Sequence, residues 1–359
     1  MEGVAAMKPF IHESRPCRVV FAEGSVDQLP AEVERLGAKR VMLISGGGRR
    51  ALVDRLAARL GHHCVDHYNK AAMHVPHEQV TEAASRVAEL EVDCCVTVGG
   101  GSAIGLGKML ALTAGLPVIA IPSTYSGSEM TPIYGYTQDR VKRTGRDPVV
   151  RPKTVIYDPL LTLTLPVAVS TSSGMNAMAH CIEAIYAADA DPITVLMAEE
   201  GLRSLVKALP MLALEPGNRA ARSLALYGAW LAGMSLAGAS MGLHHQLCHV
   251  LGGAFNLPHA QTHALVLAHV VHYNRDAVPD AMHRIGQALG SADPADGLYR
   301  LLSRLALPAG LGELGVPRSG IEGVARRVAE TPYPNPAPVL YDRVHALLLR
   351  AHEGLPPMH

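Results

Sequence analysis

The chain has 359 residues, of which 48% are hydrophobic and 18% charged, and its 32 basic and 32 acidic residues give a formal net charge of zero. This length favours two domains over one core, and the balanced charge argues against nucleic acid or an anionic membrane as the main partner. No secretory leader and no membrane-spanning run of about 20 apolar residues is expected. Six cysteines without a CxxC pair favour a reducing, cytoplasmic setting.

Strand-like and helix-like segments alternate through the first 158 residues. Apolar, strand-like runs occupy 17–24, 40–48, 93–101 and 116–124, and segments with helical spacing occupy 25–38, 49–61, 77–90 and 103–115. Repeated β-α-β units with continuous apolar strands predict a Rossmann-like parallel sheet that is covered on both faces. Residues 131–157 predict a hairpin excursion that returns to a final strand.

The pattern changes after Asp158, where Ala, Leu and Met recur at helical spacing and β-branched runs become few. We therefore predict an α/β dinucleotide-binding domain over 1–158 and an all-helical domain over 159–359. A cleft between two such domains is a usual place for a ligand.

A glycine-rich loop follows the third apolar run, where VTVGGGSAIGLGK places Gly99, Gly100 and Gly101 between a strand and a helix. Glycines at this position let backbone N–H groups approach a phosphate at the helix N-terminus. Three glycines alone are equally compatible with a tight turn. The next strand, however, leads into IPSTYSGSE, and two consecutive strand ends open on the same edge of a parallel sheet. The two loops together favour pyrophosphate binding, although the pattern matches neither GxGxxG nor Walker A.

The end of the second apolar run bears on the choice of nucleotide. In VMLISGGGRR, Ser45 and Gly46 stand where an acidic residue would select NAD over NADP, and Arg49 and Arg50 follow. A 2′-phosphate would meet no repulsion there, so we expect both NADH and NADPH to be accepted. Two arginines on a solvated helix start are the simpler explanation of this pair.

Six histidines crowd residues 244–269, HHQLCHVLGGAFNLPHAQTHALVLAH. His245 and His249 are four apart and share a helical face, and His259 and His263 repeat that spacing after a helix break. Upstream, His180 follows Asn176 by four residues. A single histidine on an apolar helix is usually a core residue, but several at this spacing favour a common site.

Motifs along nearly the whole chain resemble those of the iron-containing alcohol dehydrogenase family. They are GGGS, PSTYSGSE, DPLLTLTLP, NAMAHCIEA and HxxxHxxGxxFNLPH, in the family's order. The resemblance implies a dehydroquinate-synthase-like fold, a homodimer and a metal site at Asn176, His180, His245 and His259. It also implies that His249 lies beside the substrate and that Lys153 contacts the cofactor ribose.

Two departures separate the chain from the general family pattern. Asn176 stands where the family has a metal-binding Asp, and a neutral amide is a weak ligand that offsets no cationic charge. Gly105 stands where the family often has Asp, while Lys108 is kept. With GGGSAIGLGK, IPSTYSGSEMTP and TPYPNPAPV, these departures resemble the branch that reduces maleylacetate. That resemblance implies NAD(P)H-dependent reduction of maleylacetate to 3-oxoadipate in aromatic degradation, generally without a required metal.

The chemistry of this reaction agrees with the altered site. Hydride can add to the far carbon of an alkene conjugated to a ketone, and the resulting enolate can be met by histidine or other hydrogen-bond donors instead of a metal. Without a carboxylate ligand, the histidines are expected to titrate near pH 7.

The expected site combines catalytic, substrate-binding and cofactor-binding groups. The catalytic candidates are His249, His245, His180 and His259, with His249 or His245 as the proton donor. The candidates for binding the dicarboxylate substrate are Tyr125, Ser126, Asn176 and His263. The candidates for binding NADH or NADPH are Gly99, Gly100, Gly101, Ser102, Ser123, Thr124, Ser128 and Lys153.

Three other functions stay open on the sequence alone. One is a zinc- or iron-dependent alcohol or polyol dehydrogenase that uses His180, His245 and His259 as metal ligands. Another is a lyase of the dehydroquinate-synthase type, and the third is a non-catalytic sensor.

Overall fold

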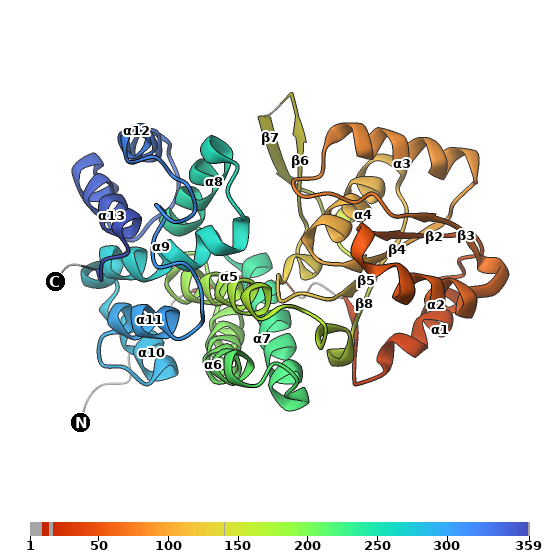
Figure 1. Cartoon of the computed structure of the whole chain (residues 1–359), viewed down its shortest axis with the longest axis horizontal. Coiled ribbons are helices and arrows are strands. Elements are labelled where there is room, and N and C mark those ends of the chain that lie inside the picture. Colours follow the sequence, from red (N-terminus) through yellow and green to blue (C-terminus); the bar gives the residue numbers. More distant parts are fainter. Residues whose placement is uncertain (1–8, 14–16, 140, 358–359) are drawn as a thin grey trace.

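A computed structural model describes residues 9–13, 17–139 and 141–357 (Figure 1). Its main sheet consists of β1 (Arg18–Phe21), β2 (Val41–Ser45), β3 (Cys64–Tyr68), β4 (Cys94–Gly99), β5 (Val118–Pro122) and β8 (Thr154–Tyr157). The strand order is β1-β8-β5-β4-β2-β3, and every pair is parallel. The predicted parallel sheet is confirmed. Strand β3 was not anticipated, because its side chains are mostly half-buried and lack a continuous apolar run.

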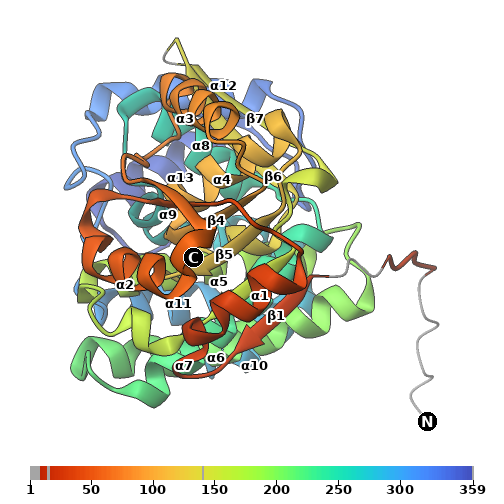
Figure 2. The same cartoon turned by 90° about the vertical axis from the view of Figure 1, so that its right-hand side faces the viewer.

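Helices cover both faces of this sheet. They are α1 (Leu29–Arg35), α2 (Arg50–Leu60), α3 (His77–Glu89) and α4 (Gly101–Ala114). Figure 2 shows β4 and β5 between α1 and α2 on one side and α3 and α4 on the other. Cys94 packs into the apolar cluster on the first side and Cys95 into the cluster on the second. Successive side chains of a strand point to opposite faces, so the doubly buried Cys-Cys pair fits a strand covered on both sides.

A two-stranded hairpin stands apart from the main sheet. Strands β6 (Ile133–Gln138) and β7 (Val141–Arg146) pair antiparallel, and their backbone is tied to the preceding loop by Thr137 N–H, which donates to Val75 O at 3.0 Å. In Figure 1 the hairpin rises between the sheet and α8. The predicted excursion and its return to a strand, β8, are confirmed.

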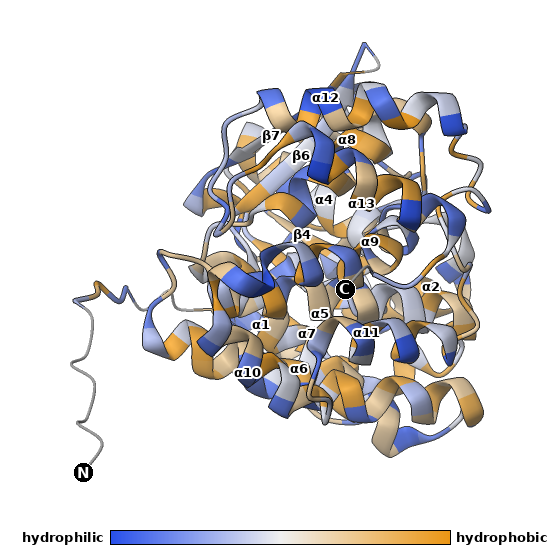
Figure 3. Ribbon diagram, turned by 90° about the vertical axis from the view of Figure 1, so that its left-hand side faces the viewer, coloured by the Kyte–Doolittle hydropathy of each residue, from blue (hydrophilic) through white to orange (hydrophobic). Residues whose placement is uncertain are grey.

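The C-terminal part consists of helices. They are α5 (Val167–Tyr186), α6 (Pro192–Leu214), α7 (Arg219–Gly238), α8 (Leu243–Phe255), α9 (His259–Asn274), α10 (Pro279–Leu289), α11 (Pro294–Ser303), α12 (Ile321–Glu330) and α13 (Tyr341–Glu353). Short 3₁₀ turns lie at Ser25–Gln28, Gly47–Arg49, Gly61–His63, Ser128–Met130, Pro148–Val150, Pro159–Thr162, Arg275–Ala277 and Arg318–Gly320. Helix α5 is buried from Ser170 to Tyr186, whereas α12 and α13 alternate hydrophilic and hydrophobic residues (Figure 3). We therefore place the centre of the helical part at α5.

The sheet and the helices share one apolar cluster. Ala120 of β5 and Val155 of β8 belong to the same cluster as Met178 and Ile182 of α5. The last strand ends at Tyr157 and α5 begins at Val167, so the predicted boundary at residue 158 stays a prediction that falls in this connection.

Among the described residues no single helix is long and apolar enough to cross a membrane. The pair α7 and α8 meets that test only jointly, and its two helices are bent by 98°.

Candidate active site

The two predicted cofactor loops lie against each other at the carboxyl ends of β4 and β5. Ser123 N–H donates to Gly99 O at 2.9 Å. A Cβ on Gly100 would lie 2.9 Å from Thr124 Cγ2, a separation that real Cβ atoms do not show. The close approach therefore requires glycine at position 100. Gly101 begins α4 and is exposed, so unpaired amides of the first helical turn face the space in front of both loops.

The serine-rich loop is held from beneath by Lys108 of α4. Its buried Nζ donates to Ser128 O at 2.5 Å, Thr131 Oγ1 at 2.9 Å and Ile133 O at 2.7 Å. Burial lowers the pKa of Lys108 to about 7. Because all three donor positions are used inside the protein, Lys108 orders the loop, in which the hydroxyls of Ser126 and Ser128 lie 3.3 Å apart.

The position of Gly105 explains one departure from the family pattern. A Cβ at this glycine would lie 2.7 Å from Val75 Cγ2. The loop that carries Val75 occupies the space that an Asp side chain would need.

Lys153 is wrong as a cofactor contact. It precedes β8, and its N–H donates to Val118 O at the start of β5. This is the amino-terminal edge of the sheet, opposite the edge that carries Gly99–Gly101. In a parallel sheet all strands end on the same edge, so Lys153 cannot reach the glycine loop.

A chain of hydrogen bonds links α5 and α8 in the buried interior. Asn176 Nδ2 lies 3.2 Å from His180 Nε2, and His180 Nδ1 lies 2.8 Å from His245 Nε2. His245 Nδ1 lies 2.6 Å from Glu183 Oε2. The predicted convergence of Asn176, His180 and His245 is confirmed, and the chain ends on a carboxylate that the sequence analysis did not single out.

Glu183 anchors this chain. Its carboxylate also accepts from the N–H groups of Gly242 and His244, both at 3.0 Å, where α8 begins. Burial alone raises the pKa of Glu183, but the hydrogen bond from His245 and the nearby His245 and His244 rings outweigh it and lower that pKa to about 2. A fixed negative charge therefore stands behind His245. The i, i+4, i+7 spacing of Asn176, His180 and Glu183 was the signal that could have identified it.

The remaining histidines extend this group towards α9. Asn256, in the left-handed conformation at φ 51°, ends α8, and α9 begins three residues later at His259. The rings of His249 and His259 lie 6.3 Å apart, and those of His259 and His263 lie 4.3 Å apart. The predicted return of the second histidine pair towards the first is confirmed, and the turn after Asn256 makes it.

A cavity of about 530 Å³ lies between the hairpin and the junction of α8 with α9. Its lining includes His74, Thr137, Lys142, His249, Asn256 and His259. None of its described lining residues is acidic, and Lys142 supplies an amino group whose pKa is lowered by burial. The cavity therefore favours an anionic ligand. Lys142 and His74 were not anticipated, because each comes from a segment with no motif of its own.

Two expected substrate contacts lie elsewhere. Tyr125 is fully buried and its hydroxyl accepts from Arg222 Nη1 at 3.2 Å, inside the core between the sheet and the helices. The expectation that Tyr125 contacts a substrate carboxylate is therefore wrong for this structure. His263 is also fully buried and is not among the residues that line the cavity, so the structure does not place it in contact with a ligand there. Ser126 stays close to the histidines, since its backbone lies beside the ring of His180.

The buried histidines are neutral in this arrangement. Burial lowers the pKa of His244 to about 3 and holds the pKa values of His180 and His263 well below the ordinary range. Desolvation and the charge of Lys142 also lower the pKa of His249, which is exposed to the cavity. The expectation that these histidines titrate near pH 7 is thus wrong for the chain without substrate.

The arrangement does not fit a metal ion at the four positions implied by the resemblance. If Asn176 donates to His180, His180 to His245 and His245 to Glu183, every ring nitrogen of the two histidines is already paired. In the described part of the chain, the donor atoms that gather within 4.8 Å of one another belong to His244, Cys248 and His263, a different set. A shared metal would require His180 and His245 to give up their direct hydrogen bond.

Comparison with known proteins identifies close relatives. Residues 16–159 match the family model for iron-containing alcohol dehydrogenase, and residues 170–352 match the model for the C-terminal part of that family. A maleylacetate reductase of Burkholderia cepacia is 49% identical over 98% of this chain and 100% of its own length. The crystal structure of maleylacetate reductase from Agrobacterium tumefaciens superimposes with a TM-score of 0.95 at 43% identity, over 98% of this chain and 100% of that one. The Rhizobium maleylacetate reductase gives a TM-score of 0.94 at 45% identity, with the same coverage.

Proposed function

Because the chain belongs to the iron-containing alcohol dehydrogenase family and matches maleylacetate reductases along nearly its whole length, we propose that it reduces maleylacetate to 3-oxoadipate with NAD(P)H and without a resident metal. The observation that carries the metal-free part is the hydrogen-bonded chain Asn176–His180–His245–Glu183, which uses the nitrogens that a metal would need.

The cofactor lies along the two loops at the ends of β4 and β5. Gly99–Gly101 and Ser102 face its pyrophosphate, together with Ser123, Thr124 and Ser128 of the second loop. When bound, NAD(P)H supplies the hydride for the alkene carbon that is conjugated to the substrate's ketone. The cavity beside His249 and His259 then holds the carbon skeleton, and the positive charge of Lys142 offsets part of the substrate's charge.

His249 is the proposed proton donor. Its ring opens onto the cavity, whereas His180 and His245 are buried in the hydrogen-bonded chain. A dianionic substrate beside it favours the imidazolium form and so raises its pKa on binding. The proton enters with the substrate and passes to the carbon next to the ketone as the enolate collapses.

Both nucleotides are expected to serve as hydride donors. Ser45, at the end of β2, forms a hydrogen bond with His67 at 2.9 Å, and no carboxylate stands at this position. Arg49 reaches Thr164 at 3.2 Å, and the exposed Arg50 beside the strand end forms an ion pair with Asp54 at 3.7 Å. A kcat/KM for NADPH within about tenfold of that for NADH is expected. A much larger difference between the two values would contradict the expectation that both nucleotides serve as hydride donors.

The direct test is the rate of NADH oxidation with maleylacetate, using enzyme dialysed against EDTA. Turnover that is unchanged by the chelator, and by added zinc or iron, supports the proposal. Activity that EDTA removes and zinc or iron restores would assign His180, His245 and His259 to a metal instead. Full activity on simple aldehydes and none on maleylacetate would contradict the substrate.

We further propose a cytoplasmic homodimer. All six cysteines are free thiols, which suits a reducing compartment. A sedimentation experiment that gives twice the 38.1 kDa mass of one chain would support the dimer, and a monomer would contradict it.

A further inference from the structure

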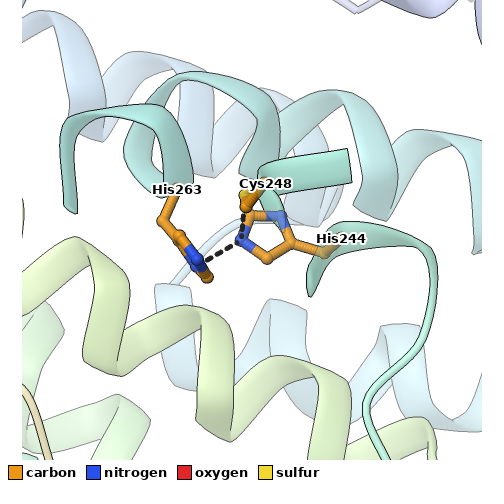
Figure 4. A group of neighbouring side chains, drawn as sticks. All are labelled: His244, Cys248 and His263. Carbon is orange, nitrogen blue, oxygen red and sulfur yellow. Dashed lines mark hydrogen bonds between the residues drawn. The ribbon is translucent and has the colours of Figure 1, made fainter. Parts of the chain in front are cut away.

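A second group of potential ligands lies behind the catalytic histidines. His244 and Cys248 come from successive turns of α8, and His263 comes from α9 (Figure 4). All three are buried, with exposed fractions of 0%, 1% and 0%. Figure 4 shows the two rings and the thiol directed towards one another. The reduction proposed above gives no role to His244 or Cys248.

The distances in this group are close to those that a bound cation imposes. His244 Nε2 lies 3.1 Å from His263 Nδ1 and 3.7 Å from Cys248 Sγ. In a trigonal site, bonds of about 2.0 Å to nitrogen and about 2.3 Å to sulfur place a nitrogen and a sulfur about 3.7 Å apart and two nitrogens about 3.5 Å apart. The sulfur is therefore in place, and the two rings need to separate by about 0.4 Å.

Neither imidazole ring is held in one tautomer by a partner at its outer nitrogen, the ring nitrogen that points away from the other two ligands. His244 Nδ1 and His263 Nε2 are buried and form no hydrogen bond with the described residues. Each ring can therefore carry its proton on the outer nitrogen and present the inner lone pair to a cation. The hydrogen bonds that must break first are those within the group itself, between His244 Nε2 and His263 Nδ1 and between His244 Nε2 and Cys248 Sγ.

Charge and coordination number indicate which cation fits. One thiolate and two neutral imidazoles balance a single positive charge, and a buried site with net charge is costly. The described residues offer three donors here, whereas structural Zn²⁺ normally takes four ligands. Soft thiolate and imidazole ligands suit Cu(I), which carries one positive charge.

The site can be reached from the catalytic cavity. Cys248 lines that cavity together with His249 and His259, so an ion can approach the sulfur from there. Binding forms a Cu–S bond and breaks the S–H bond, and the released proton leaves through the same opening.

We propose that His244, Cys248 and His263 form a three-coordinate Cu(I) site next to the catalytic histidines. Occupancy inhibits the enzyme. His245 and His249 follow two of the ligands in the chain, and the ring of His263 lies 4.9 Å from that of His245 and 4.3 Å from that of His259. Moving His263 to open the site shifts these neighbours.

The test is an anaerobic titration of the reduced, metal-free protein with Cu(I) against a chromophoric Cu(I) chelator. One equivalent per chain should bind tightly, and X-ray absorption should show one sulfur and two imidazole nitrogens around the copper. The Cys248→Ala variant should lose at least tenfold in affinity. Cys64→Ser, which removes a half-buried thiol on β3, is the matched control and should bind like the original chain.

Activity gives a second measurement that does not depend on the basal rate of each variant. The ratio of rates with and without one equivalent of Cu(I) should fall in the original chain and stay near one in Cys248→Ala. If that variant does not fold, Cys248→Ser replaces it, since a hydroxyl is a poor Cu(I) ligand of similar size. Equal Cu(I) affinity with and without the thiol, a copper site without sulfur, or binding of Zn²⁺ and not Cu(I) would overturn the proposal.

Discussion

Glu183 shows how one buried residue can define the chemistry of a site. Its carboxylate holds His245 Nδ1 at 2.6 Å and caps the start of α8 through two backbone amides. A fixed carboxylate behind a histidine sets the tautomer and the orientation of the ring. The histidine chain therefore depends on a buried residue that does not line the cavity.

Replacing Glu183 with Gln should lower kcat by about 10–100-fold and leave the KM for NADH nearly unchanged. The amide keeps the size of the side chain but removes the charge that orients His245. Steady-state kinetics at several pH values measure the effect, with Glu200→Gln on α6, a half-buried carboxylate paired with Arg203, as the control. An unchanged kcat and pH profile in Glu183→Gln would show that the chain of hydrogen bonds has no part in turnover.

Gly100 tests the proposed position of the cofactor. In Gly100→Ala, the new Cβ would lie 2.9 Å from Thr124 Cγ2, so the two loops must move apart. We expect the KM for NADH to rise at least about tenfold, because backbone amides that are displaced no longer reach the pyrophosphate. Gly323→Ala on α12 meets no atom within 4 Å and should behave like the original chain. Normal nucleotide affinity in Gly100→Ala would place the pyrophosphate elsewhere.

The hairpin is the element that completes the catalytic cavity. Strand β7 lies between two strands of the sheet, β5 and β8, in sequence, yet it brings Lys142 across to α8 and α9 of the helical part. The cavity is thus built from both parts of the chain, and its positive charge comes from a strand that the main sheet does not contain.

Lys142→Met should raise the KM for maleylacetate or for NADH at least about tenfold, because the cavity then loses its lysine ammonium group. Measuring both constants shows which of the two ligands the ammonium group contacts. Arg143→Met removes a neighbouring charge whose side chain does not line the cavity, so it serves as the control. If neither constant moved, the anionic preference of the cavity would have another source.

Folding of the whole molecule buries several neutral histidines, which should make its stability depend steeply on pH. The pKa values of His180, His244 and His263 are lowered in the folded chain, so below about pH 6.5 the unfolded chain binds protons that the folded chain does not. Stability is fully present above that pH and is lost as the pH falls. Glu183, with a pKa of about 2, adds a further loss between about pH 4.5 and pH 2.

Three such histidines together reduce the free energy of unfolding by roughly 4 kcal/mol per pH unit below pH 6.5. Thermal unfolding followed by circular dichroism should therefore show a falling Tm between pH 6.5 and pH 5. A Tm that stays constant across this range would mean that the histidines are protonated inside the folded protein.

The sequence by itself determined the local features: the parallel sheet, the glycine loop at the end of β4, the hairpin excursion and the shared helical face of Asn176 and His180. These follow from periodicity and from short-range steric rules, which depend on neighbours within a few residues. Only the tertiary structure decided which distant groups meet. It joined Glu183 to His245, 62 residues away. It also brought Lys142 to the cavity, left Lys153 on the opposite edge of the sheet, and enclosed Tyr125 against Arg222. The physical reason is that burial selects a face of each element, while the partners of buried polar groups depend on how whole elements pack.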